Sequence, residues 1–132
     1  FGQESLERAA ALGDLSSQEY LDALATSRRL SRDEGIDALL ARHQVEALVA
    51  ITTGPSWPVD HVSGHRFGGG SSTWAAVAGY PAITVPMGMI QGLPIGLSFM
   101  GPAWSEARLI GLAYAFEQAT KARRAPTFQP VI

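Results

Sequence analysis

The sequence contains no cysteine, one lysine and little charge of either sign. The absence of cysteine excludes disulfides and thiolate metal sites. A net charge of −2, with 17% charged residues, provides no basic stripe, so we expect no nucleic-acid partner. No apolar run reaches the ~18 residues of a membrane span, so we expect no membrane partner. The absence of cysteine fits a cytoplasmic protein, and we expect no metal or cofactor.

Apolar residues, glycine and proline are what the sequence has in quantity. Apolar residues make up 46%, beside 14 glycines and 8 prolines, which suits buried strands joined by tight loops. At 132 residues the chain fits one domain or part of a larger one. Because it begins at Phe1 rather than Met, we interpret it as a piece of a longer polypeptide, with tag removal as the alternative.

The N-terminal third has apolar side chains at helical spacing. A short helix is expected within residues 1–15, ending at Gly13. Capping boxes at Ser16–Glu19 and Ser31–Glu34 predict the starts of two further helices. Nothing between these two helices forces a break, so a single bent helix is the alternative. Their arginines are expected to form a solvated face.

Three short apolar runs predict strands: Ala47–Ile51, Ala82–Val85 closed by Pro86, and Ile95–Met100. The first is expected to be buried on both faces. The short turn Gln91–Pro94 predicts that the second and third strands form an antiparallel hairpin.

The second half also predicts a long loop and two helices. Residues 52–70 are rich in Gly, Pro and polar side chains and longer than most structureless connections, which favours a functional loop. Ser71–Thr73 is expected to cap a short helix that stops at Gly79, and Ser105 to cap an amphipathic helix through Ala119. Helices alternating with buried strands predict an α/β layer architecture.

The most informative segments are Ala75–Gly88 and Gly92–Gly101, which closely resemble the C-terminal core of the amidase signature family. The resemblance extends in order and spacing through Phe1–Glu4, Gly35–Asp37, Glu46–Val49, Ser71–Ser72, Ser105–Glu106 and Leu112–Thr120. It implies an α/β/α sandwich with a mixed β-sheet flanked by helices. It also implies that residues 1–132 are the C-terminal portion of one amidase signature domain, incomplete by itself.

The resemblance implies hydrolysis of a carboxamide to a carboxylate plus ammonia or an amine. In that family a Ser attacks the carbonyl, and a Lys acts through a second Ser in a cis peptide; these groups lie upstream of the matched region. The one lysine here, Lys121, follows the last helix beside Arg123 and Arg124, where we expect exposure rather than the desolvation that a basic lysine needs. We therefore assign no catalytic residue and expect the chain alone to be inactive.

Other polar residues offer weaker alternatives. Gly68–Ser72 superficially resembles the family's nucleophile segment but lies in the wrong place, so we interpret it as a turn into a helix cap. A hydrolase triad of Asp60, His61 and Ser71, or a metal site of Asp60, His61 and His65, matches no specific signature.

The long loop and the helix after it supply the expected substrate-binding residues. In amidase signature proteins the loops that follow the strands form the walls of the substrate pocket. The resemblance implies the same role for this loop. The candidates for shaping an acyl or amine subsite are Trp57, Asp60, His61, Phe67 and Trp74. The alternative is that both tryptophans pack against the sheet.

Three functions therefore stay open. The first is an amidase fragment whose partners are a small-molecule amide and the missing N-terminal part of the same enzyme. The second is a fragment of the glutamine-using subunit of a glutamyl-tRNA(Gln) amidotransferase, and the third is a non-catalytic binding or assembly module derived from an amidase. Because a cut sheet exposes its edges, we also expect homo-oligomers.

Overall fold

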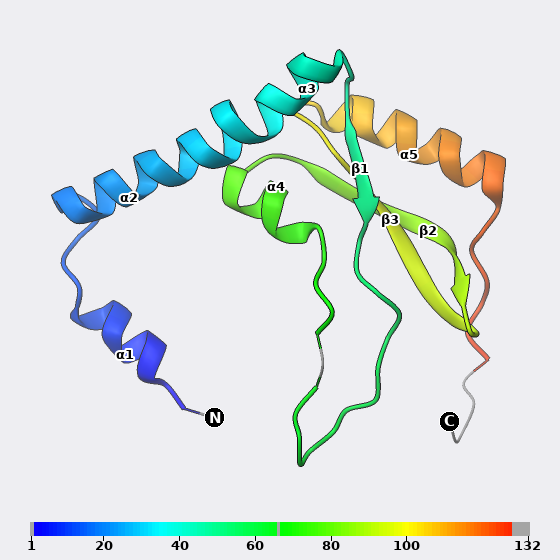
Figure 1. Ribbon diagram of the computed structural model, residues 1–132, viewed down its shortest axis with the longest axis horizontal. Coiled ribbons are helices and arrows are strands. Elements are labelled where there is room, and N and C mark those ends of the chain that lie inside the picture. Colours follow the sequence, from blue (N-terminus) through cyan, green and yellow to red (C-terminus); the bar gives the residue numbers. More distant parts are fainter. Residues whose placement is uncertain (1, 66, 128–132) are drawn as a thin grey trace.

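The computed structural model describes residues 2–65 and 67–127, which form a small sheet with helices on both faces (Figure 1). In chain order the elements are α1 (Glu4–Ala11), α2 (Gln18–Arg28), η1 (Arg29–Ile36), α3 (Asp37–His43), β1 (Leu48–Ile51), α4 (Ser72–Ala78), β2 (Ala82–Ile90), β3 (Leu93–Met100) and α5 (Glu106–Thr120). None of the helices in the described part has the length and hydropathy that a bilayer span requires.

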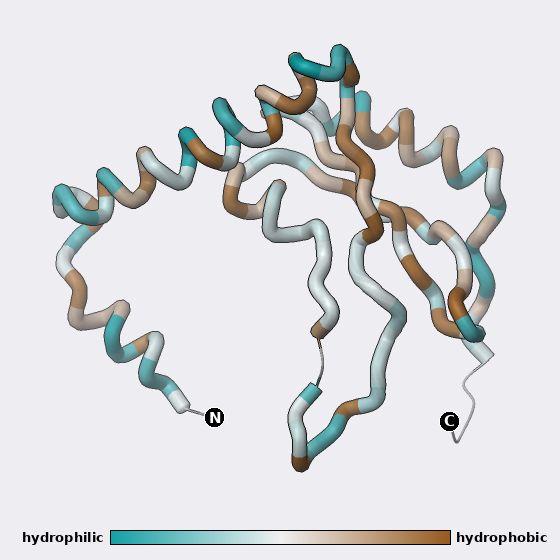
Figure 2. The backbone as a smooth tube through the Cα atoms, viewed as in Figure 1, coloured by the Kyte–Doolittle hydropathy of each residue, from teal (hydrophilic) through white to brown (hydrophobic). Residues whose placement is uncertain are grey.

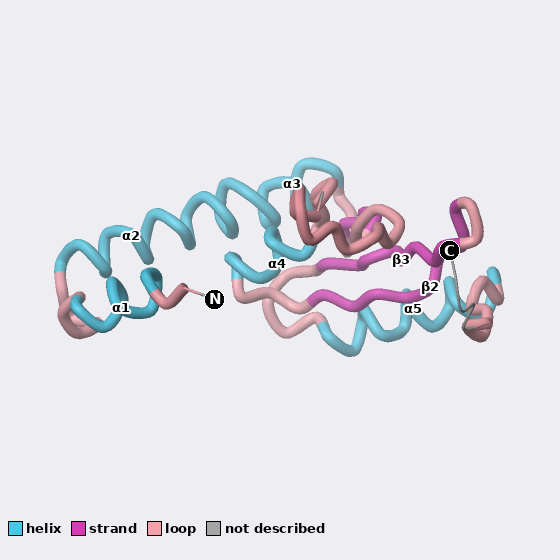
Figure 3. The backbone as a smooth tube through the Cα atoms, turned by 90° about the horizontal axis from the view of Figure 1, so that it is seen from below, coloured by secondary structure: helices cyan, strands magenta, loops and turns pink. Residues whose placement is uncertain are grey.

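Helices lie on both faces of the sheet (Figure 3), and one apolar cluster lies under each helical layer. On one face α5 packs on β2 and β3, and on the other the η1–α3 segment and α4 cover the sheet. The first cluster contains Val85, Phe99, Leu109 and Ala113, and the second Ile36, Leu40 and Ala78 with Leu48 and Tyr80 beside them. The α/β sandwich expected from the sequence is confirmed.

The strands run in the order β1–β3–β2, and both pairs are antiparallel. The predicted hairpin is confirmed: Gln91 and Gly92 connect β2 to β3 with φ of 50° and 81°, the left-handed conformations that a tight two-residue turn requires. Parallel strand pairs, which the mixed sheet implied by the resemblance would include, do not occur among the three strands described here.

The second strand is longer than the sequence predicts. Pro86 does not close it; β2 continues to Ile90, and the register shifts between Pro86 and Gly88. Proline lacks the N–H that the hydrogen-bond ladder of a sheet uses. A β-bulge interrupts that ladder, so a proline is tolerated there. The prediction that Pro86 ends the strand is therefore wrong.

Only one face of β1 is covered. Leu48 and Ala50 are half-buried on the side of α3 and α4, whereas Val49 and Ile51 are 59% and 53% exposed. The strand is apolar along most of its length (Figure 2), but α5 packs mainly on β2 and β3. The expectation of burial on both faces is wrong for the described residues.

The N-terminal helices agree only partly with their predicted caps. Ser17 caps α2, its Oγ accepting from the N–H of Tyr20 at 3.4 Å. The alternative of one bent helix is confirmed, since α2 runs through η1 into α3 with a kink at Gly35. The capping box at Ser31 is wrong, because the Ser31 hydroxyl donates to the carbonyl of Ser27, one turn back within the helix, at 2.7 Å.

Arg32 does not lie on the solvated face that was expected for the arginines of this helix. Its Nε donates to the carbonyl oxygen of Ala78 at 2.6 Å, and its guanidinium lies 5.3 Å from the centre of the Tyr80 ring. The Tyr80 hydroxyl in turn donates to Asp37 at 2.7 Å. These contacts tie the bent helix to the C-terminal end of α4.

Two serines stand at helix starts without capping them. Ser105 precedes α5, but its hydroxyl donates to the carbonyl of Pro102 at 2.7 Å. Ser71 precedes α4 and makes no side-chain cap bond either. The C-terminal stop of α4 is as predicted, with Gly79 in the left-handed conformation at φ 65°.

Candidate functional site

Three hydroxyl groups meet on the α4 side of the sheet. Thr52 follows β1, Thr84 lies on β2, and Ser98 lies opposite Thr84 on β3. The Ser98 Oγ is 2.7 Å from the Thr52 Oγ1 and 2.9 Å from the Thr84 Oγ1, and the two threonine oxygens are 3.3 Å apart. Strand register brings these oxygens together, since opposite residues of an antiparallel pair point to the same face.

A glycine makes room for this cluster. A Cβ on Gly96 would lie 2.7 Å from the Thr84 Cγ2 and 2.9 Å from the Thr52 Oγ1, which is closer than real atoms approach. The Thr52 N–H also donates to the Gly96 carbonyl at 2.8 Å, extending the β1–β3 pairing by one residue. Gly96 therefore permits the close approach of the two threonines.

Ser71 lies beside the cluster and is 2% exposed. Its N–H donates to the Thr52 carbonyl at 3.1 Å, which fixes the start of α4 next to the hydroxyls, but its Oγ has no hydrogen-bond partner among the described residues. These side chains line a cavity of about 300 Å³, which we call the hydroxyl pocket. It is lined by Thr52, Ser71, Ser72, Ala75, Ala76, Tyr80, Ala82, Thr84, Ser98 and Met100.

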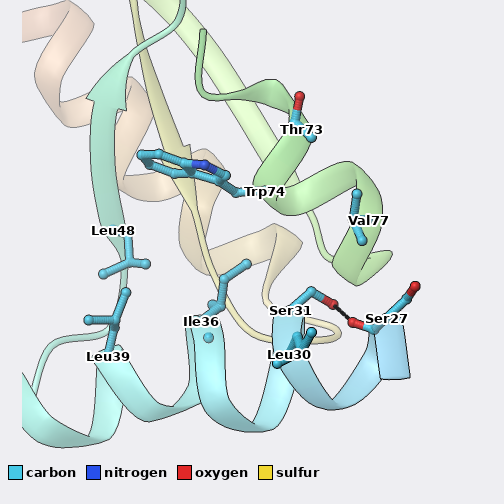
Figure 4. Close-up of a pocket in the computed structure, with 10 residues that line it drawn as sticks. Ser27, Leu30, Ser31, Ile36, Leu39, Leu48, Thr73, Trp74 and Val77 are labelled. Atoms are coloured by element: carbon cyan, nitrogen blue, oxygen red, sulfur yellow. Dashed lines mark hydrogen bonds between the residues drawn. The ribbon is translucent and has the colours of Figure 1, made fainter. Parts of the chain in front are cut away.

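A second, larger hollow of about 520 Å³ lies between the bent helix, α4 and β1, and we call it the apolar groove (Figure 4). Its lining is Ser27, Leu30, Ser31, Gly35, Ile36, Leu39, Leu48, Thr73, Trp74 and Val77. The indole of Trp74 extends from α4 toward Leu48 and is 56% exposed. The groove offers apolar contact and few polar partners.

The long loop between β1 and α4 is closed at its base. Thr53 and Gly70 form an isolated antiparallel bridge, and the Thr53 hydroxyl donates to the Gly69 carbonyl at 3.3 Å. Further out, the Trp57 ring is paired with two others: the His65 ring stacks on it with 5.8 Å between centroids and 24° between planes, and the Phe67 ring is tilted by 56° with its centroid also at 5.8 Å. The loop therefore has a fixed base and an aromatic cluster.

Asp60 organises a turn in the outer part of this loop. Its Oδ1 accepts the N–H groups of Val62 at 2.8 Å and Ser63 at 3.0 Å. These hydrogen bonds, that from Ser63 first, lower the pKa of the Asp60 carboxyl below its ordinary value. His61 lies exposed in the same turn.

The structure does not bring the five predicted substrate-binding residues to one place. Trp57 and Phe67 belong to the aromatic cluster, Asp60 and His61 to the turn, and Trp74 to the apolar groove. Trp74 is 56% exposed, and its indole extends toward Leu48 on β1. Their role in substrate binding stays a prediction.

The triad and metal alternatives gain no support. The Asp60 carboxylate is engaged by its own turn, and Ser71 is buried at the start of α4; no hydrogen bond among the described residues joins either to a histidine. Within residues 2–65 and 67–127, no group of three or more His, Asp or Glu side chains could hold a metal ion. Lys121 is exposed, as expected, and donates to the Gln118 Oε1.

Sequence reasoning missed the hydroxyl pocket. Thr84 and Ser98 stood inside runs interpreted only as buried apolar strands, and Thr52 was counted as the first residue of a loop. The available signal was the lone hydroxyl residue within each of the two runs that contain Thr84 and Ser98. These hydroxyls come together only when the strands pair, because Ser98 is 14 residues from Thr84 and 46 residues from Thr52 in the sequence.

Comparison with known proteins gives consistent matches. A model of the amidase family matches residues 10–110. A probable amidase of Arabidopsis thaliana is 36% identical over 129 residues, covering 97% of this chain and 22% of that protein. The solved peptide amidase of Stenotrophomonas maltophilia is 56% identical with a TM-score of 0.88, covering 98% of this chain and 26% of that one.

A shorter match involves a glutamyl-tRNA(Gln) amidotransferase subunit of Caldanaerobacter subterraneus. It is 49% identical over 45 residues, which are 34% of this chain and 9% of that protein. In each comparison this chain spans about a quarter or less of the length of the protein that it matches.

Proposed function

Because the chain belongs to the amidase family, we propose that it is the C-terminal part of an enzyme that hydrolyses a carboxamide to a carboxylate and ammonia or an amine. The observation that carries this proposal is the likeness to the S. maltophilia peptide amidase, at 56% identity along 98% of this chain. The same likeness supports a peptide amide as the substrate. In this proposal residues 1–132 form one incomplete domain of a cytoplasmic enzyme.

The catalytic groups are proposed to lie in the rest of the enzyme, as a Ser–cisSer–Lys triad. A serine nucleophile needs an adjacent base, and a lysine serves as base only where burial or nearby positive charge lowers its pKa. Lys121 is exposed at the end of α5. This chain would instead supply part of the sheet, its helical layers and the wall of the substrate pocket.

Substrate contacts are proposed for the loop and for α4. Trp74 offers an apolar surface to a side chain of the substrate, because its ring is open to the groove. Trp57 and Phe67 would give a second aromatic wall, with His61 at the turn. Asp60 would act indirectly, since its carboxylate holds the turn that positions these residues.

A hybrid enzyme tests this function. It joins the upstream part of the S. maltophilia peptide amidase to these 132 residues, and ammonia release from a blocked dipeptide amide is measured. We expect turnover by the hybrid and none by the upstream part or by this chain alone. A folded hybrid without turnover would contradict the proposal. Turnover by the chain alone, lost in Ser71→Ala, would contradict the upstream location of the triad.

The amidotransferase alternative is favoured by short sequence matches of 45 to 50 residues, which cover 34% to 38% of the chain. A hybrid built on an amidotransferase of this kind is expected to use glutamine and to require partner proteins, and neither is expected for the hybrid that releases ammonia from a dipeptide amide. A binding module would show saturable binding of an amide and no turnover in any hybrid. The same hybrids therefore separate the three functions.

The isolated chain is further proposed to associate with itself. β1 is an edge strand of the described sheet, and its own side chains Val49 and Ile51 are exposed. Unpaired strand edges with apolar side chains pair readily with other chains. Sedimentation at high concentration should show dimers or larger oligomers, and a clean monomer would contradict this expectation.

A further inference from the structure

The first two helices extend away from the sheet, and we call the segment that contains them, residues 4–28, the helical arm (Figure 1). Neither α1 nor α2 contains a buried residue, and of residues 2–30 only Leu24 is half-buried. α2 contacts η1 and α4, whereas α1 lies at the far end of the arm. Most of the arm therefore packs on nothing within the part of the chain that the structure describes.

The arm exposes large apolar side chains. Leu6, Leu12 and Leu15 are 70%, 72% and 72% exposed. In α1 the helical spacing places Leu6 on one face with Ala9 and Ala10. The charged residues of α1 lie on the other side: Glu4, Glu7 and Arg8. A helix with one apolar face is typical of a helix that packs against an apolar surface.

Contacts within the arm give it a bend but do not stabilise its first helix. Between the helices, the Asp14 Oδ1 accepts the N–H of Ser16 at 2.9 Å, and within α2 the Gln18 amide donates to Asp22 at 2.7 Å. Neither contact involves α1, which has 8 residues. An isolated helix shorter than about 12 residues is marginal in water, so α1 requires a surface on which to pack.

The likeness to a complete enzyme indicates what covers the arm. The match to the S. maltophilia peptide amidase includes 98% of this chain, so most of the arm belongs to the matched part. That part is only 26% of the solved enzyme, whose remaining chain is large enough to cover the arm. In the proposed function the upstream part is joined to this chain just before α1, and the covalent link keeps the two in proximity.

We propose that the helical arm is the docking surface for the upstream part of the same enzyme, and that α1 becomes stable only when that part covers it. The apolar face around Leu6 packs on apolar side chains of the upstream part. This inference rests on the proposed function, because it takes the upstream part of an amidase as the partner. A second copy of this chain is the competing occupant, and its dependence on concentration distinguishes it.

Amide hydrogen exchange of the chain alone is the first test. We expect the amides of α1 to exchange at least about a hundredfold faster than those of α5, whose Leu109 and Ala113 are buried, at low and at high protein concentration. Protection of α1 equal to that of α5 at low concentration would show that the arm needs no partner. Protection that appears only at high concentration would assign the arm to a second copy. Either result would overturn the proposal.

Hydrogen exchange of the hybrid enzyme is the second test. The amides of α1 should exchange at least about tenfold more slowly in the hybrid than in the chain alone. Leu6→Asp places a charge on the apolar face and should abolish this protection. The matched control Ser5→Asp adds the same charge at the neighbouring exposed position, outside that face, and should keep the protection. Equal exchange in the hybrid and the chain alone, or equal effects of the two variants, would overturn the proposal.

The hybrid also separates the docking surface from the function on which it rests. A folded hybrid without turnover, but with α1 protected, would reject the proposed function and retain the docking surface. An active hybrid whose α1 exchanges as fast as in the chain alone would retain the function and reject the docking surface.

Co-expression gives a readout that does not require a folded hybrid. A tagged upstream part of the S. maltophilia enzyme is produced together with this chain, and the chain that is captured is measured. Recovery of the unaltered chain and of Ser5→Asp, with at least about tenfold less Leu6→Asp, would support the docking surface. Equal recovery of both variants, or no recovery of the unaltered chain, would overturn it.

Discussion

The two faces of the sheet are built differently. On the α5 face, Val85, Phe99, Leu109 and Ala113 are all buried in one apolar cluster, and the hollow beside Leu109 has a volume of only about 210 Å³. On the α4 face the apolar cluster around Ile36 and Leu40 fills only part of the surface, and the hydroxyl pocket and the apolar groove open beside it. Both helical layers pack on the same sheet, and they differ in how far apolar side chains fill the space beneath them.

This contrast indicates a division of roles. Burial of apolar side chains without voids supplies stability. An unpaired hydroxyl and an open apolar hollow reduce stability, and proteins retain such features where a ligand or another segment uses them. We therefore expect the α5 face to govern folding and the α4 face to govern recognition.

The largest effect is expected from opening the α5 face. Leu109→Ala removes a side chain that is 1% exposed and should lower the free energy of unfolding by about 3 kcal/mol, because it leaves a cavity. Urea denaturation measures the change. Ile110→Ala is the matched control: this neighbour is 57% exposed, so its replacement should cost less than about 0.5 kcal/mol. Equal losses from both variants would contradict a closed core on this face.

A smaller effect is expected from crowding the hydroxyl cluster. Gly96→Ala places a Cβ against Thr84 and Thr52, which should destabilise the fold by about 1–3 kcal/mol. Gly111→Ala is its control, since no atom lies within 4 Å of the added Cβ and alanine favours a helix. That control should stabilise by about 0.5–1 kcal/mol in the same denaturation assay. Stabilisation by both variants would mean that the cluster does not depend on Gly96.

The smallest effect concerns the tie between the bent helix and α4. The hydrogen bond to Asp37, followed by burial, raises the pKa of Tyr80 above its ordinary value of 10.0. The neutral phenol is therefore favoured in the folded state. Its contribution is complete below pH 10 and is lost as the pH rises from the unfolded pKa through the raised folded one.

Denaturation at alkaline pH, with Tyr80→Phe as the comparison, measures this contribution. The wild-type chain should lose more stability above pH 10 than the variant does, by less than about 1 kcal/mol for a half-buried hydrogen bond. Identical pH profiles would show that the Tyr80 hydroxyl does not stabilise the fold.

Local patterns predicted the elements whose signals are local. The apolar face of α5, the Gly79 stop and the hairpin turn at Gln91 and Gly92 each depend on residues within a few positions of one another. The long loop was likewise marked by its own composition. The sandwich also followed, since alternating helices and buried strands have few other ways to pack.

The predictions that were wrong concern residues whose structure depends on contacts with residues far away in the sequence. Ser31 carries a capping signal, yet the helix continues through it to the kink at Gly35, and Arg32 next to it bonds to Ala78. Pro86 ends a strand by propensity, but its pairing with Gly96 and the bulge after it let β2 continue. The hydroxyl pocket was invisible for the same reason, because its members meet only through strand register.

The closed base of the long loop has a consequence for how this scaffold can change. Thr53 and Gly70 pair directly, so the segment between them begins and ends at one point on the sheet. The entropy of closing a flexible loop grows slowly, and doubling its length costs only about 0.6 kcal/mol. Segments of other lengths could therefore be grafted between these two residues while the strands keep their register.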